Sequence, residues 1–130
     1  MGVKTVRETD LVREIRKAAE ARGCLVARTN AGRVPVSDAG GRRYAFGGAA
    51  KGWSDLTGCL PDGRFLAIEV KVPGKYPSDA QWDFLQQVNT RNGVGFWADD
   101  LLAAIEAIEA AVEGYAVSLI LRRDSEIHWR

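Results

Sequence analysis

The sequence predicts a single α/β domain over residues 1–130, in which a mixed central β-sheet is flanked by helices. Three observations predict this fold. Apolar residues recur at helical spacing in three segments, apolar and polar residues alternate along the middle of the chain, and the segments follow the order helix, meander, helix, strand, helix. A length of 130 residues is enough for one hydrophobic core and too short for two domains.

The first third of the chain begins with a helix. Leu11, Val12 and Ile15 recur at helical spacing within residues 7–22, and Gly23 ends the helix as a C-terminal cap. The segments that follow indicate, in order, a strand, a glycine-rich loop, a short strand and a second glycine-rich bend: residues 24–28, 30–41, 43–46 and 47–52.

The middle of the chain is predicted to form a β-hairpin. Residues 54–60 and 64–72 have the pattern of strands, and Pro61, Asp62 and Gly63 supply the turn between them. This hairpin carries most of the residues that point to a function.

The last third alternates helices and strands. Ser78 caps a helix that reaches about residue 91, and residues 94–98 indicate a short strand. Asp99 opens a second amphipathic helix that ends near residue 113, with one apolar face made of Leu101, Ile105, Ile108 and Val112. Residues 115–130 indicate two further short strands.

The composition is that of a soluble globular protein, with 46% hydrophobic and 27% charged residues. No apolar run approaches the ~20 residues needed to cross a bilayer. Residues 1–9 contain no apolar segment that would serve as a signal peptide. Cys24 and Cys59 lie in apolar stretches without metal-ligand spacing, which favours buried reduced thiols. We therefore expect a cytoplasmic protein.

Charge is unevenly distributed, although the formal net charge is only +1. Residues 28–51 contain five basic residues and one acid, whereas residues 99–113 contain five acids and no base. The basic stretch is a candidate surface for nucleic acid, and its binding would then weaken as salt rises. Basic loops are also often only solubilising surface. The five basic residues are Arg28, Arg33, Arg42, Arg43 and Lys51.

Two carboxylates occupy matching positions in the hairpin. The turn centres on Asp62, and Asp55 and Glu69 each lie seven residues from that centre. In a regular antiparallel pair such residues are cross-strand neighbours, about 4.5–5.5 Å apart between their Cα atoms. Like charges directly opposite each other destabilise a sheet, so something must offset their repulsion. A divalent cation bound by oxygen ligands does so.

Glu69 and Lys71 share one face of the second strand, because side chains alternate along it, and they lie about 6.6 Å apart. Two carboxylates and a lysine suit metal-assisted phosphodiester hydrolysis. The carboxylates hold Mg²⁺ or Mn²⁺, which lowers the pKa of a bound water, and the lysine positions that water and offsets charge on the phosphate. The alternative is an exposed sheet face with an ordinary Glu–Lys pair.

Asp62 offers a different match to a Pro-Asp motif, together with Pro61. It lies at the hairpin tip, about 23 Å along the strand from Glu69, where an aspartate is typical of a turn. We therefore expect Asp55, and not Asp62, to be the metal ligand.

Glu8 falls in the middle of the apolar stripe of the first helix, between the directions of Ile15 and Ala19. A carboxylate aimed at the core needs a partner, and a metal ion under the helix would provide one. The alternative is a capping box from Thr5 to Glu8, in which Glu8 only closes the helix end. Glu14 lies at the edge of the stripe and is a weaker candidate.

Gln81 presents a similar choice. Ser78 and Gln81 fit a capping box, yet Gln81 also lies in phase with the apolar residues of its helix, Phe84, Leu85 and Val88. A glutamine facing the core at a helix start would reach a phosphate or water in a site.

Other features are less specific. His128 is the only histidine, so a histidine-based metal site is not expected. The tryptophans are candidates for stacking on bases, although such residues more often pack in a core or at its rim. They are Trp53, Trp82, Trp97 and Trp129.

Taken together, the motifs resemble the virus-type replication-repair nuclease (VRR-Nuc) domain, a branch of the PD-(D/E)xK nucleases. The resemblance spans about residues 8–100, and the combined motifs are fairly specific, whereas Glu-x-Lys alone is not. The motifs are Glu8 at a helix start, residues 28–33 (RTNAGR), residues 52–58 (GWSDLTG), residues 67–71 (AIEVK), and Ser78 with Gln81.

The resemblance implies a restriction-endonuclease-like core with a metal site. Asp55 and Glu69 would hold the cation, and the carbonyl of Val70 would assist. Lys71 would be the catalytic lysine, with Glu8 and Gln81 as further site residues. The motif at 28–33 adds Asn30 to the candidate nucleic-acid-binding residues. Ser54 stands where the wider superfamily often has proline, a position without a chemical role.

The expected function is therefore that of a Mg²⁺- or Mn²⁺-dependent DNA endonuclease, acting on branched or Holliday-junction-like DNA in a bacterial or phage-infected cell. The resemblance also implies a homodimer, for which the C-terminal strands and Trp129 are candidate elements. Two alternatives remain: a restriction-type or exonuclease member of the superfamily, and a binding module that keeps the nuclease fold. The presence of Asp55, Glu69 and Lys71 disfavours the binding module.

Overall fold

The computed structural model describes residues 7–29, 34–46 and 50–115. The elements in this part of the chain follow the order α1 (Glu8–Ala21), β1 (Leu25–Arg28), β2 (Val34–Ser37), β3 (Arg43–Phe46), β4 (Leu56–Cys59), β5 (Phe65–Val70), α2 (Asp79–Thr90), β6 (Val94–Ala98) and α3 (Leu101–Val112).

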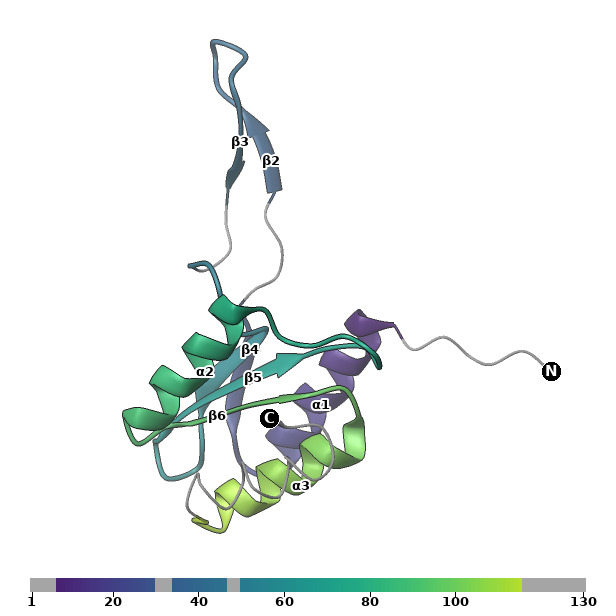
Figure 1. Cartoon of the computed structure of the whole chain (residues 1–130), viewed down its shortest axis with the longest axis vertical. Coiled ribbons are helices and arrows are strands. Elements are labelled where there is room, and N and C mark those ends of the chain that lie inside the picture. The colour runs from purple at the N-terminus through teal and green to yellow at the C-terminus, as the bar shows by residue number, and fades with distance from the viewer. Residues whose placement is uncertain (1–6, 30–33, 47–49, 116–130) are drawn as a thin grey trace, which may run out of the picture.

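Four strands form a mixed sheet in the order β1-β4-β5-β6. β4 pairs antiparallel with β1 and β5, whereas β6 pairs parallel with β5. Helix α2 packs against β5 and β6 on one face, and α1 and α3 pack together on the other (Figure 1). The predicted α/β fold, a mixed central sheet flanked by helices, is confirmed.

Strand β5 is buried on both faces. Leu66, Ile68 and Val70 have no exposed surface and face α1 and α3, while Glu69 on the opposite face is only 1% exposed. A continuous apolar run is what a central strand covered on both sides requires. A glutamate in such a strand departs from that pattern and marks the position for closer inspection.

Helix α3 differs from the sequence prediction in its cap and in its buried face. Asp100, not Asp99, is the N-cap, and its side chain accepts a hydrogen bond from the N–H of Ala103. Of the four residues predicted to form the buried face, only Ile108 is fully buried, and Val112 is exposed. The buried face is instead mostly alanine, because α3 packs against both α1 and β6 and small side chains allow close approach. These alanines are Ala103, Ala104, Ala107, Ala110 and Ala111.

The glycine-rich stretch predicted as a loop over residues 30–41 contains a strand. β2 pairs antiparallel with β3, with Ser37 opposite Arg43 next to the turn. Asp38 fixes that turn, because its Oδ1 accepts hydrogen bonds from the N–H groups of Gly40 and Arg42, both at 2.9 Å. The hairpin stands away from the four-stranded sheet (Figure 1).

The remaining predictions have mixed outcomes. Cys24 is buried and Cys59 is half-buried, and both are free thiols. None of the helices in the described ranges is both long and apolar enough to cross a membrane. The strands predicted within residues 115–130, and Trp129 with them, lie outside the described residues except for Tyr115, which is 49% exposed.

Candidate active site

Asp55 and Glu69 lie opposite each other, as the hairpin geometry predicts. In the β4–β5 register Leu56 pairs with Ile68, and one step further places Asp55 across from Glu69. Both carboxylates are buried, with 5% of Asp55 and 1% of Glu69 exposed. The predicted opposition is confirmed as geometry, and the chemical role of the pair stays a prediction.

Asp62 is confirmed as a turn residue. Its Oδ1 accepts a hydrogen bond from the N–H of Arg64 and its Oδ2 one from Arg64 Nε at 2.7 Å, while 54% of its side chain is exposed. The hydrogen bonds from Arg64 hold the pKa of Asp62 below its usual value. Asp62 therefore stabilises the turn, at the opposite end of the hairpin from Glu69.

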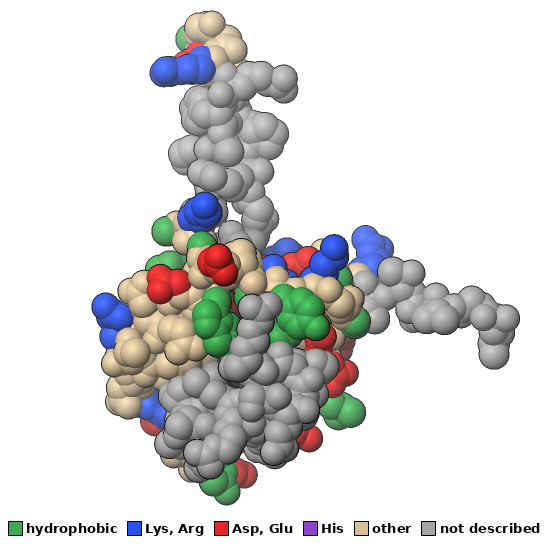
Figure 2. All heavy atoms as spheres, viewed as in Figure 1, with side chains coloured by type: hydrophobic (Ala, Val, Ile, Leu, Met, Phe, Trp, Pro, Cys, Tyr) green, Lys and Arg blue, Asp and Glu red, His purple; other side chains and the backbone are tan. Residues whose placement is uncertain are grey.

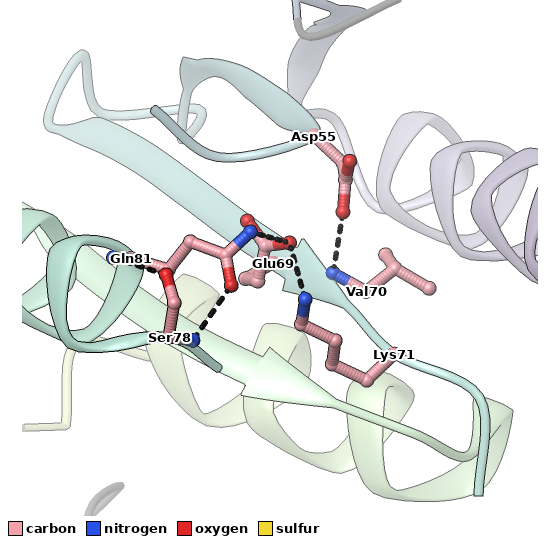
Figure 3. Close-up of polar contacts among 6 residues, drawn as sticks. All are labelled: Asp55, Glu69, Val70, Lys71, Ser78 and Gln81. Carbon is pink, nitrogen blue, oxygen red and sulfur yellow. Dashed lines mark hydrogen bonds and ion pairs between the residues drawn. The ribbon is translucent and has the colours of Figure 1, made fainter. Parts of the chain in front are cut away.

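The Asp55 carboxylate is held by the backbone of the neighbouring strand. Its Oδ2 accepts a hydrogen bond of 2.9 Å from the N–H of Val70 (Figure 3). The N–H of Thr29 donates to the backbone oxygen of Asp55, so both sides of this segment are tied down. Asp55 is thus fixed in orientation just beyond the end of β4.

The Glu69 carboxylate has one partnered and one unpartnered oxygen. Gln81 Nε2 donates to Oε1 at 3.1 Å, and Lys71 Nζ lies 3.7 Å from the same atom (Figure 3). Oε2 is buried and receives no hydrogen bond from any residue in the described ranges. Lys71 is largely covered, with 19% of its side chain exposed.

Gln81 fills both of the roles that the sequence presents as alternatives. Ser78 is the N-cap of α2, and a capping box forms in which Gln81 Oε1 accepts from the N–H of Ser78. The amide nitrogen of the same side chain donates to Glu69. Its carbonyl oxygen closes the helix end and its amino group reaches the site, so neither role excludes the other.

Glu8 begins α1, and its capping alternative is not formed. The N-cap of the helix is Arg7, so Glu8 is the first helical residue and not the third, as a capping box requires. Glu8 is exposed, and its negative charge adds to the effects that raise the pKa of Glu69. Glu14 lies on the solvent side, where its carboxylate is 3.8 Å from Lys17.

The donor set around Glu69 fits a divalent cation. Burial, then the charge of Asp55 and a side-chain hydrogen bond with Asp55, raise the pKa of Glu69 to about 9, against the opposing effect of Lys71. Two buried carboxylates side by side repel each other, and a divalent cation held by both would offset that repulsion in place of the proton on Glu69. In the described ranges, neither this site nor any other brings three His, Cys, Asp or Glu side chains close enough together to hold a metal ion. Two carboxylates are therefore the ionisable ligands that the site offers.

We expect the metal-free protein to lose stability as pH rises from about 4.5 to about 9. Over that interval the folded state keeps a proton on Glu69 that the unfolded chain has released, so raising the pH favours unfolding. Calorimetry in EDTA at several pH values should show the melting temperature of the wild type falling relative to that of Glu69→Gln. A difference between the two proteins that stays constant with pH would contradict the raised pKa.

The candidate nucleic-acid-binding residues are only partly brought together. Arg28 at the end of β1 and Lys51 are exposed. Arg42 lies in the β2–β3 turn, with its Nε 3.3 Å from Asp38 Oδ2, and 84% of its side chain is exposed. On the side of the body from which this hairpin rises, basic side chains lie interspersed with acidic ones (Figure 2). Asn30 and Arg33, and the side chain of Arg43, lie outside the described residues.

Sequence analysis missed one polar group beside the site. Ser54, next to Asp55, is fully buried, and its hydroxyl has no hydrogen-bond partner in the described part of the chain. The sequence did contain a sign of this polar group, because serine stands where the superfamily often has proline. The family resemblance assigns no chemical role to this position, so it does not predict a buried hydroxyl there.

Comparison with known proteins finds a structural relative. No family model matches the sequence, and no curated protein matches it. Among solved structures, a chain titled "VRR_NUC domain" is similar, with a TM-score of 0.54 and 23% sequence identity over 78% of this chain and 94% of that chain. At this level of identity the likeness establishes a shared fold, in agreement with the fold that the motifs imply.

Proposed function

We propose that this chain, which has the fold of the VRR_NUC domain, is a metal-dependent endonuclease that hydrolyses phosphodiester bonds in branched DNA. One observation carries the proposal: Asp55 and Glu69 form a buried pair of carboxylates with Lys71 beside it, and Glu69 Oε2 accepts no hydrogen bond from the described residues. A structural ion pair would have satisfied that oxygen. A site that must bind and release an ion leaves it open.

Asp55 and Glu69 would hold Mg²⁺ or Mn²⁺, with the carbonyl of Val70 as a further oxygen donor. Glu8 is exposed, and its carboxylate would have to turn toward the ion to join them. The ion would activate the attacking water and stabilise the charge of the transition state. The two carboxylates are oriented by hydrogen bonds within the protein: the Val70 N–H donates to Asp55, and the Gln81 amide donates to Glu69.

In this proposal Lys71 acts directly on the reacting phosphate, and Gln81 acts by positioning Glu69. Lys71 holds the attacking water and offsets the charge that develops on the phosphate oxygens. Its ammonium group is kept 3.7 Å from Glu69 and mostly out of solvent, which strengthens its electrostatic effect. Gln81 keeps Glu69 in place, and its own position is fixed by the capping box with Ser78.

The candidate DNA-binding residues would hold the substrate through its phosphates, namely Arg28, Asn30, Arg33, Arg42, Arg43 and Lys51. The affinity of the protein for DNA should fall with rising salt, because each phosphate contact releases counterions. A homodimer would set two sites against the paired strands of a junction. Sedimentation of the free protein measures that assembly directly.

The first experiment is cleavage of linear, flapped and four-way-junction DNA of matched sequence, each with Mg²⁺, Mn²⁺ or EDTA. We expect cutting with either metal and none in EDTA, and faster cutting of the branched substrates. A closed circular substrate carrying a junction separates endonuclease from exonuclease activity, because it has no ends.

The alternatives correspond to other outcomes of the same assay. Binding of the junction without cleavage of any substrate would support the binding module. Cleavage of linear DNA from its ends, with the closed circle left intact, would support an exonuclease. Cleavage that persists in EDTA would contradict the proposed role of the two carboxylates.

A further inference from the structure

A cavity of about 470 Å³ lies between the start of β5 and the second half of α2. Its volume is within the range of small-molecule and cofactor pockets. The lining residues that matter for its chemistry are Lys51, Trp53, Phe65, Phe84, Val88 and Arg91. Of these residues, the proposed function uses only Lys51, as a phosphate contact.

Three aromatic rings form the apolar part of the cavity. Trp53 packs against Phe84 with the ring centroids 4.4 Å apart, and against the edge of Phe65 at 6.3 Å. Trp53 Nε1 also donates to Thr57 Oγ1 at 3.5 Å, which ties the indole to β4. Phe65 is 38% exposed, so the cavity presents an aromatic surface to solvent.

The charges of the cavity are of one sign. Among the residues that the structure describes, Lys51 and Arg91 are the charged residues that line it, both are exposed, and none of the lining residues is acidic. Flat aromatic surface combined with cationic groups is the arrangement that binds a nucleotide, because rings stack on the base and cations attract the phosphates. A purely apolar partner would leave both cations without a counterpart.

The cavity and the candidate site lie on one face of the same strand. Phe65 and Glu69 are four residues apart along β5, about 13 Å at the usual strand rise. That length corresponds to about four nucleotides of a stacked strand, at ~3.4 Å each. One DNA strand can therefore reach both places.

The segment that carries two of the cavity residues also packs against the helix that carries Gln81. Gly52 has a φ of +87°, and a Cβ at this position would lie 2.5 Å from the backbone oxygen of Ala80. Only glycine allows the segment that carries Lys51 and Trp53 to lie so close to the first turn of α2, where Gln81 contacts Glu69.

We propose that this cavity receives an unpaired nucleobase of the DNA strand that the candidate site cuts. The inference rests on the proposed nuclease function and extends it to substrate selection. A base inside a duplex is stacked and paired, and entering the cavity would cost its unstacking energy. An unpaired nucleotide at a branch point avoids that cost, so the cavity favours branched over fully paired substrates.

The test measures binding in EDTA, so it does not depend on cleavage. The probes are a labelled single-stranded oligo(dT) and an abasic strand of the same length, which has the same phosphates and no bases. We expect the wild type to bind oligo(dT) roughly tenfold more tightly, the size of one base–aromatic stack. Phe65→Ala and the apolar Phe65→Leu should both lose this preference while binding the abasic strand as the wild type does.

Two matched variants separate stacking from charge. Tyr115→Ala removes another exposed aromatic ring, outside the cavity, and should keep the preference. Lys51→Ala should weaken the binding of both probes equally and reduce the salt slope by about 0.7.

The outcomes distinguish this inference from the proposed function. A protein that cuts DNA with Mg²⁺ but binds both strands equally would overturn the nucleobase cavity alone. A protein that prefers the base-bearing strand and cuts nothing would overturn the nuclease and retain the cavity. If Phe65→Leu alters the oligomeric state and leaves the base preference unchanged, the cavity is a contact between copies of the chain and the inference is wrong.

Discussion

Replacing Glu69 with glutamine is expected to abolish DNA cleavage and, at the same time, to stabilise the metal-free protein. Glu69 is 1% exposed, its Oε2 has no partner among the described residues, and Asp55 lies opposite. Glutamine has the same shape, keeps an oxygen for the Gln81 amide, and is neutral without a proton, whereas Glu69 must take one up on folding at pH 8. An unsatisfied buried polar group costs about 1–3 kcal/mol, so we expect a gain of that order at pH 8.

Cleavage depends on the charge that this substitution removes. Loss of one of two carboxylate ligands should lower the rate by at least ~10³-fold, because the ion contributes several kcal/mol to the transition state. The paired measurements are the cleavage rate with Mg²⁺ and the melting temperature in EDTA. The matched control is Glu113→Gln, an exposed residue at the end of α3, which should change neither. Wild-type activity in Glu69→Gln would exclude Glu69 as a ligand.

Replacing Lys71 with alanine is expected to lower the cleavage rate by about 10²–10³-fold while leaving metal binding in place. That factor is the usual cost of removing one group that stabilises developing charge. Lys71 is a point charge 3.7 Å from Glu69 Oε1, placed to act on the phosphate, whereas the metal ligands are the carboxylates. Metal binding is followed independently by the rise in melting temperature on adding Mn²⁺.

The control for this prediction is Lys75→Ala, an exposed lysine four residues further along the chain. It should cut DNA at the wild-type rate. If Lys71→Ala also loses the Mn²⁺-dependent rise in melting temperature, Lys71 supports the carboxylates and does not act on the phosphate. If both lysine variants lose activity to the same extent, the effect is general electrostatic attraction of DNA.

The hairpin is the part of the site that the sequence predicts best. A short turn fixes the register of the two strands around it, so equal distance from Asp62 is enough to place Asp55 opposite Glu69. The alternation along β5 then places Lys71 beside Glu69. Both are local consequences of backbone geometry, and they need no knowledge of the rest of the molecule.

Predictions that depended on packing were less successful. The buried face of α3 was wrong because hydrophobicity favours the large apolar residues, whereas close packing on α1 and β6 selects the alanines. β2 was predicted as loop because its glycine-rich surroundings hide a strand that pairs only with β3.

The two candidate site residues on helices also show the difference between what local sequence predicts and what packing decides. Helical phase predicts that Glu8 and Gln81 face inward, but Glu8 is exposed, and phase alone leaves the capping and site roles of both residues open. The start of α1 at Glu8 removes one capping box. In α2 the side chain of Gln81 is long enough to serve the cap and Glu69 together.

The fold class, the order of the elements apart from β2, and the opposition of Asp55 and Glu69 can be predicted from the sequence, because they follow from periodicity and from a turn between adjacent strands. The tertiary structure alone decided how deeply Glu69 is buried, which of its oxygens lacks a partner, and that Trp53, Phe65 and Phe84 meet in one cavity. These properties arise where elements distant in sequence pack together, and spacing along the chain carries no information about such contacts.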